Sequence, residues 1–277
     1  MATVTQRVNK IKRPGTDYIS PSEFDRWYLK STERLSPIGS ENVHPGVVGL
    51  VVDYLTRFIL SNDVRAAFSV SLKGAAVCSL CKENEEPLLV CEELLNKVKG
   101  LDATSIESAC KIATFDVWHR CLFKAPDMKG YEETNPNTVT IDNIRIMVER
   151  SLSFFEKYGP ITKIGFDFYP NGYSKTITAG DGDYLTKDTL WDFKVSKDHP
   201  KSVNVLQVLT YWVMGQHSDQ DIFKDIYKIG IYNPRLNIAY TYELSWMDEY
   251  LISAVEDNII CYEPVKGKNI SMIWGHY

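Results

Sequence analysis

The chain has 277 residues, enough to bury a full hydrophobic core and to form one large domain or two modest ones. Its formal net charge of −5 gives no sign of a strongly basic nucleic-acid binder, although a local basic patch is compatible with that total. No run of about 18 apolar residues is present, which excludes a typical membrane-spanning helix, and the first residues lack the apolar stretch of a signal peptide. We expect a cytoplasmic protein without membrane association.

The first part of the chain has the pattern of helices. Ser20, Pro21 and Glu23 form the signature of a capping box at a helix start. Gly100 and Gly159 have the positions of helix ends. The expected helices cover residues 20–32, 44–62, 85–100, 102–123 and 138–159.

After Pro160 the hydrophobic period changes from 3.6 residues to 2, which is typical of strands. Asn171-Gly172 is a strong hairpin signal between two of these strands. The expected strands cover residues 162–170, 173–185, 189–197, 224–233 and 236–244, with helices at 201–215 and 245–258 and an optional further strand after 258. We therefore divide the chain into a mainly helical region, 1–158, whose last helix joins the core, and an α/β core of the α+β type, 159–277.

The stretch GDGDYLTKDTLWDFK, residues 180–194, places aspartates on two neighbouring strands, where Asp is usually rare. Side chains alternate along a strand, so Asp192 and Lys194 share one face, while Trp191 and Phe193 share the other. A connecting loop of two or four residues puts Asp183 directly opposite Asp192, and a loop of three residues puts them on opposite faces unless a bulge intervenes.

Two facing carboxylates repel each other, and a divalent cation between them removes that repulsion. Oxygen ligands suit Mg²⁺ or Mn²⁺, and the carbonyl of Phe193 is a candidate third ligand. A metal lowers the pKa of a bound water, and the ammonium group of Lys194 can stabilise developing charge on a phosphate. The bland alternative is a surface hairpin in which Asp and Lys form a salt bridge, since so short a motif recurs by chance.

Asp183, the run Asp192-Phe193-Lys194, and Gln207 with Tyr211 on the next helix resemble, in that order, the motifs of the PD-(D/E)XK nuclease superfamily. The pattern is most similar to the RecB-type branch with its CRISPR-associated and phage-type exonucleases. The resemblance covers residues 160–232. It implies a restriction-endonuclease-like core, with a central mixed β-sheet flanked by helices.

The resemblance also implies roles for these residues. Asp183 and Asp192 would ligate the metal, Lys194 would be the catalytic lysine, and Gln207 and Tyr211 would border the site and contact the nucleic acid. Nearby lysines and aromatics would supply phosphate contacts and stacking: Lys197, Lys201, Tyr169 and Tyr173.

Such families often add an acidic ligand from an early helix. Asp53, in a strongly apolar helix, is our candidate, and Glu149 and Glu156 compete with it. For each of them the plain alternative is an ordinary capping or surface acid. Cys78, Cys81 and Cys91 form half of a zinc or iron–sulfur pattern, with buried structural thiols as the alternative.

We therefore expect a Mg²⁺- or Mn²⁺-dependent nuclease acting on DNA, with an end- or single-strand-processing exonuclease activity, and with a protein partner in a DNA-processing or defence system as an option. A second hypothesis keeps the fold without catalysis, as a nucleic-acid-binding or protein-interaction module of a phage or mobile element. Hydrolysis of RNA or of another phosphodiester is a third.

Overall fold

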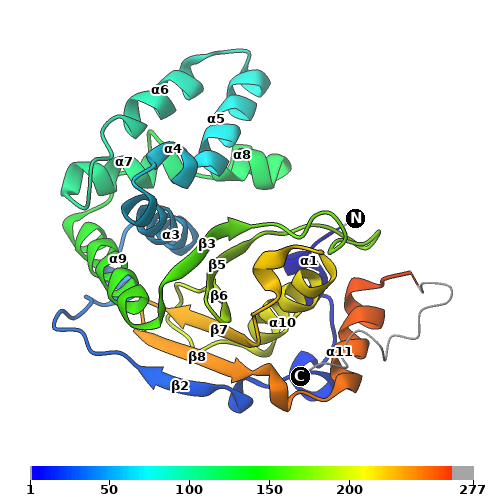
Figure 1. Ribbon diagram of the computed structural model, residues 1–277. Helices are drawn as coiled ribbons and strands as arrows, with labels where there is room; N and C mark the ends of the chain where they lie inside the picture. The colour runs from blue at the N-terminus through cyan, green and yellow to red at the C-terminus, as the bar shows by residue number, and fades with distance from the viewer. Residues whose placement is uncertain (1, 264–277) are drawn as a thin grey trace.

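A mixed six-stranded β-sheet forms the centre of the protein in a computed structural model that describes residues 2–263 (Figure 1). The strand order is β2-β8-β7-β6-β5-β3, in which β6 and β7 run parallel and every other neighbouring pair is antiparallel. The strands are β2 (Asp25–Tyr28), β3 (Ile161–Phe166), β5 (Gly182–Thr186), β6 (Thr189–Phe193), β7 (Lys228–Asn233) and β8 (Ile238–Glu243). The chain is thus a mixed α/β protein, as expected.

The hairpin of β5 and β6 has the geometry that the sequence predicted. Its loop has two residues, Lys187 and Asp188, and the register pairs Tyr184 with Trp191 and Leu185 with Leu190. Continuing that register by one residue places Asp183 opposite Asp192. The expected two-residue alternative is confirmed.

Helices cover both faces of the sheet. On one face, Leu185 and Leu190 share a core with α10 (Ser202–His217), α1 (Val4–Val8) and residues of α11 (Glu249–Val255). On the other face, Trp191 and Phe193 pack with Phe154 and Phe155 of α9 (Thr138–Tyr158). This division confirms the expected alternation along β6.

The expected helix over residues 20–32 is wrong beyond its first turn. Ser20 and Glu23 do form the capping box, but the turn ends at Glu23 as a 3₁₀ helix, and Asp25–Tyr28 pairs with β8 as an edge strand. Trp27 and Tyr28 favour strands, and the free edge of β8 outweighs the local helix signal.

Residues 2–28 therefore belong to the sheet part of the molecule. Val4, Val8 and Phe24 lie in the same hydrophobic core as the strands after residue 160. The expected division between residues 158 and 159 does not follow the packing, because this N-terminal segment completes the core on the other side of that boundary.

The Asn171-Gly172 hairpin is also wrong. β3 ends at Phe166, which pairs with Gly182, so residues 167–181 form a long connection. Pro170 has no backbone N–H to continue a ladder, and the amide of Gly172 instead donates to the carbonyl of Phe168 at 2.7 Å. Within the connection, the short strand β4 (Ile177–Ala179) pairs in parallel with β1 (Ala2–Thr3).

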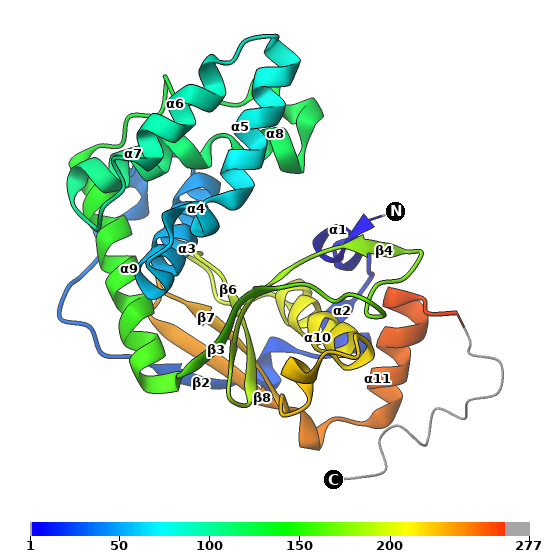
Figure 2. The ribbon, with the colours of Figure 1, turned by 45° about the horizontal axis from the view of Figure 1, so that its top comes forward.

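A second group of helices packs beside the sheet around its own hydrophobic core (Figure 2). They are α3 (Pro45–Ser61), α4 (Val64–Ala67), α5 (Ser69–Lys82), α6 (Glu86–Leu95), α7 (Ala103–Ala113) and α8 (Asp116–Arg120). The sequence predicted α3, α6 and α9, predicted α7 and α8 as one helix, and did not predict α4 or α5. In both ribbon views α3 and α9 lie between the sheet and the outer helices.

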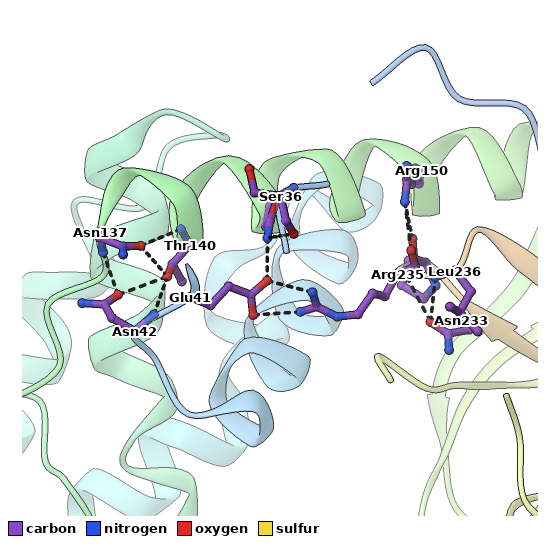
Figure 3. A network of polar contacts seen from close by, with 11 residues as sticks. Ser36, Glu41, Asn42, Asn137, Thr140, Arg150, Asn233, Arg235 and Leu236 are labelled. Atoms are coloured by element: carbon purple, nitrogen blue, oxygen red, sulfur yellow. Dashed lines mark hydrogen bonds and ion pairs between the residues drawn. The ribbon is translucent and has the colours of Figure 1, made fainter. Parts of the chain in front are cut away.

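A buried ion pair fastens the helical part to the sheet (Figure 3). Arg235, in the turn after β7, donates to both carboxylate oxygens of Glu41 at 2.7 and 3.0 Å, and the two side chains are 7% and 2% exposed. Asn143 of α9 donates to the same carboxylate, and Arg150 of α9 donates to the carbonyls of Pro234 and Arg235 at 3.1 Å. This network sets how the helices sit against β7 and β8.

The remaining helices are short. They include α2 (Pro14–Asp17), which packs on α10, and a π-helical turn at Glu256–Ile260. The sequence left a further strand open after residue 258. Residues 259 and 260 belong instead to this π-helical turn, and most of the rest of that stretch lies outside the described residues. Within residues 2–263, no helix has the length and apolar character needed to cross a bilayer.

Candidate functional site

Asp183 and Asp192 meet at the end of the β5–β6 hairpin, where the strands approach α3. Asp183 is 23% exposed and accepts the backbone N–H of Phe193 at 2.9 Å through Oδ2. Asp192 is almost fully buried, with a side chain that is 4% exposed. The structure therefore brings together the two carboxylates that the sequence placed opposite each other.

Lys194 lies on the same face as Asp192, as the alternation predicts. Its Nζ is 3.1 Å from Oδ1 and 3.0 Å from Oδ2 of Asp192, and its side chain is 29% exposed. Although Oδ2 contacts the ammonium group, it forms no hydrogen bond within the described part of the chain. The ion pair with Lys194 offsets the burial of the Asp192 carboxylate, and Asp183 opposite it adds a second negative charge.

The pKa values of the pair reflect its crowding. Burial, together with the carboxylates of Asp53 and Asp192, raises the pKa of Asp183 to about 7, and Arg57 and Lys194 oppose that shift. Burial likewise raises the pKa of Asp192, with Lys194 opposing that shift. Burial lowers the pKa of Lys194, but the carboxylates of Asp192 and Asp183 raise it above its ordinary value, so the lysine stays charged.

Arg57 is the site residue that sequence reasoning missed. Its Nε lies 2.9 Å from both oxygens of Asp53, one turn earlier in α3, and its Nη2 donates to Oδ1 of Asp183 at 3.1 Å. The guanidinium also lies 3.1 Å from the position that a Cβ on Gly165 would occupy, and Gly165 has a φ of +61°. A side chain there would crowd Arg57, so β3 leaves room for it. The only sequence signal was the Asp53–Arg57 spacing of four residues.

Asp53 lies at the site, but its carboxylate is held by protein donors. Besides Arg57, the phenol of Tyr184 donates to Oδ1 at 2.9 Å. Asp53 therefore reaches the aspartate pair through Arg57. Its role as a metal ligand stays a prediction.

Gln207 and Tyr211 lie side by side on α10, next to the pair. Nε2 of Gln207 donates to the hydroxyl of Tyr211 at 2.8 Å and to Oγ1 of Thr5 at 3.2 Å. Both side chains are buried, and Thr5 belongs to α1. Burial and the nearby carboxylates of Asp192 and Asp183 raise the pKa of Tyr211 far above its ordinary value. The motif thus borders the site, but α1 covers the face through which it was expected to meet a ligand.

The donor set at the hairpin fits one divalent cation. Asp183 and Asp192 lie opposite each other, and Asp192 is the more buried of the two. With the carbonyl of Phe193 they would hold a Mg²⁺ or Mn²⁺ ion whose other ligands are water or phosphate oxygens. Among residues 2–263, no group of three or more His, Cys, Asp or Glu side chains is arranged to hold a metal. A third acidic ligand is therefore not part of this arrangement.

The competing acidic candidates lie elsewhere. Glu149 pairs with Arg145 at 3.0 Å, and Glu156 is exposed on α9. The cysteine motif is dispersed as well: its first and third thiols, Cys78 and Cys91, are buried in the helical core, and the second, Cys81, is exposed. Burial raises the pKa of Cys91 to about 12, as for an inert structural thiol.

Of the surface residues expected to contact nucleic acid near the site, three are exposed and one is held by a hydrogen bond. Lys197 and Lys201 are exposed in the loop between Lys194 and α10, and Tyr169 is 61% exposed. Tyr173 is instead tied down, because its hydroxyl donates to the carbonyl of Gly180 at 2.6 Å. This hydrogen bond steadies the turn that leads into Asp183.

Comparison with known proteins returns no relative: no protein-family model, no curated protein and no solved structure matches the chain. The assignment of a function therefore depends on the chemistry of the site.

Proposed function

We propose that the protein is a metal-dependent deoxyribonuclease of the PD-(D/E)XK type, with a restriction-endonuclease-like core most similar to the RecB branch. The observation that carries the proposal is the position of Asp183 opposite Asp192 with Lys194 on the same face. A hairpin that only needed a salt bridge would not bury a second carboxylate beside the first.

Each residue has a role in phosphodiester hydrolysis, in which water adds to phosphorus and the bond to one sugar oxygen breaks. Asp183 and Asp192 would hold the cation, which when bound lowers the pKa of a water and offsets phosphate charge. Lys194, fixed by Asp192, would stabilise the charge that develops on the phosphate. Arg57 keeps the carboxylate of Asp183 oriented.

The preference for DNA ends or single strands is part of this proposal and rests on the family resemblance of Gln207 and Tyr211. Because α1 covers these side chains, they act by shaping the wall of the site next to Asp192. The helical part beside α3 would then form the opposite wall of a nucleic-acid channel.

The test is an incubation with end-labelled linear, circular and single-stranded DNA, in Mg²⁺ or Mn²⁺ and in EDTA. We expect metal-dependent cleavage of linear or single-stranded DNA that Lys194→Ala abolishes. Absence of cleavage of every substrate in both metals would overturn the proposal.

One observation favours a second candidate, a nucleic-acid-binding module without catalysis. Both oxygens of Asp183 already accept hydrogen bonds from protein donors, Arg57 and the Phe193 amide, so part of the pair is stable without a metal. Lys194→Ala separates the two functions: a nuclease loses cleavage and keeps DNA binding, whereas a binding module keeps its full biological activity.

A further inference from the structure

A second carboxylate network lies in the helical part, around Asp116. Its side chain is 3% exposed and accepts hydrogen bonds from the hydroxyls of Tyr54 in α3 and Ser71 in α5. Arg120, at the end of α8, completes the set with Nε at 3.2 Å from Oδ2. The buried carboxylate is thus bound from three elements, and it fixes the direction of one arginine.

Arg120 is held at its base and open at its end. While Nε engages Asp116, 47% of its side chain remains exposed. An arginine fixed in this way loses little conformational freedom when its outer N–H groups bind an anion, and the planar guanidinium suits phosphate oxygens.

Arg120 lies within electrostatic range of Asp181, at the start of the hairpin. Burial lowers the pKa of Arg120, but the Tyr54 oxygen and the carboxylates of Asp116 and Asp181 raise it above its ordinary value. Asp181 lies two residues before Asp183. In both ribbon views α8 lies on the side of the helical layer that is turned toward α1 (Figures 1 and 2). No ion pair joins Arg120 to Asp181 in the described part of the chain.

The same helix serves both centres. In α3, Asp53 and Arg57 reach the aspartate pair, while Tyr54 reaches Asp116. The distance between the hairpin and Arg120 is therefore set by one rigid element of 17 residues.

We propose that Arg120 binds a backbone phosphate of the DNA substrate across from the Asp183–Asp192 pair, and that Asp116 is its positioning residue. The inference rests on the proposed function for its choice of ligand. What it adds to that function is a specific contact between Arg120 and a phosphate on the helical side of the site.

The experiment measures binding of a labelled single-stranded DNA by fluorescence anisotropy in EDTA, where no cleavage occurs. Arg120→Gln is expected to raise Kd about tenfold, since it removes a charge-assisted hydrogen bond. It should also reduce the slope of log K against log salt by about 0.7, the value for one phosphate contact on a single strand. Arg65→Gln is the matched control, because Arg65 is an exposed arginine of the same helical part, paired with Glu92.

Arg120→Lys retains the charge, and it serves as the second variant if the glutamine variant fails to fold. It is expected to bind more weakly than the wild type, with an unchanged salt slope. Wild-type affinity in the folded Arg120 variant, or an equal loss in Arg65→Gln, would overturn the inference.

The binding measurements distinguish a failure of the phosphate contact from a failure of the nuclease proposal. A protein that binds DNA through Arg120 and never cleaves it supports the phosphate contact and overturns the nuclease. A protein that cleaves DNA and binds it equally well when Arg120 is replaced supports the nuclease and overturns the phosphate contact. A wild-type protein that binds no DNA overturns both.

Discussion

Two buried aspartates in this protein have opposite surroundings. Asp116 in the helical part accepts hydrogen bonds from Tyr54, Ser71 and Arg120, so its charge is fully used by the fold. Asp192 in the hairpin is paired with Lys194 at 3.0–3.1 Å, and it lies opposite the carboxylate of Asp183. Burial alone does not mark a functional acid, but burial opposite a second carboxylate is a stronger indication.

The largest effect is expected at the hairpin. Lys194→Ala should lower the rate of DNA cleavage by roughly 10²–10³-fold, the usual cost of one group that stabilises transition-state charge. Single-turnover cleavage of linear DNA measures the rate, and circular dichroism checks the fold. A decrease of less than about threefold would mean that Lys194 forms only a structural salt bridge with Asp192.

The contrast between the two aspartates can be tested with the same substitution at each. Asp116→Asn should lower the free energy of unfolding by about 2 kcal/mol, because one of its hydroxyl donors loses its acceptor. Asp192→Asn should change it by less than about 1 kcal/mol, since its replacement also removes the repulsion from Asp183. Urea unfolding of both variants gives the comparison. An equal loss of unfolding free energy in the two variants would contradict the difference between Asp116 and Asp192.

The pair also predicts a pH dependence of stability. The pKa of Asp183 is raised to about 7, above its value in the unfolded chain, so the folded state retains a proton that the unfolded state releases. Stability should therefore fall as pH rises from about 4 to 7, at less than about 1.4 kcal/mol per pH unit for one proton. Urea unfolding across this range should show a smaller fall in Asp183→Asn, with Asp192 contributing the remainder in the same direction.

Arg57 sharpens the comparison, because it is the cation that forms an ion pair with Asp183 among the described residues. Arg57→Gln should lower the free energy of unfolding in EDTA by about 1–2 kcal/mol. Mg²⁺ should then raise its melting temperature more than that of the wild type, since Oδ1 of Asp183 becomes available to the ion. Arg65→Gln, which breaks an exposed pair worth less than about 1 kcal/mol, is the control. An equal Mg²⁺ response in all three proteins would exclude competition between Arg57 and the cation.

The predictable part of the site was its local part. Alternation along residues 189–194 and the short loop determine which face Asp183, Asp192 and Lys194 share, and these need only strand geometry. The position of Gln207 and Tyr211 on one helical face followed in the same way.

The remainder depends on contacts that are distant in sequence. Arg57 and Asp183 are 126 residues apart in the sequence, and Thr5 and Gln207 are 202 residues apart. No local sequence pattern predicts either contact. The error at residues 20–32 has the same origin. A sound capping box was overridden by the edge of β8, a partner more than 200 residues away that no local window contains.

The placement of β2 has a consequence for how the chain is made. Its partner β8 ends at Glu243, so during synthesis the first segment leaves the ribosome long before the strand that it joins exists. Val4 and Val8 are exposed during that interval, and α10, on which α1 packs, is also made late. Folding of the sheet is thus governed by a long loop closure, which is slow. The nascent chain can complete the helical core first and add α1 and β2 to the sheet last.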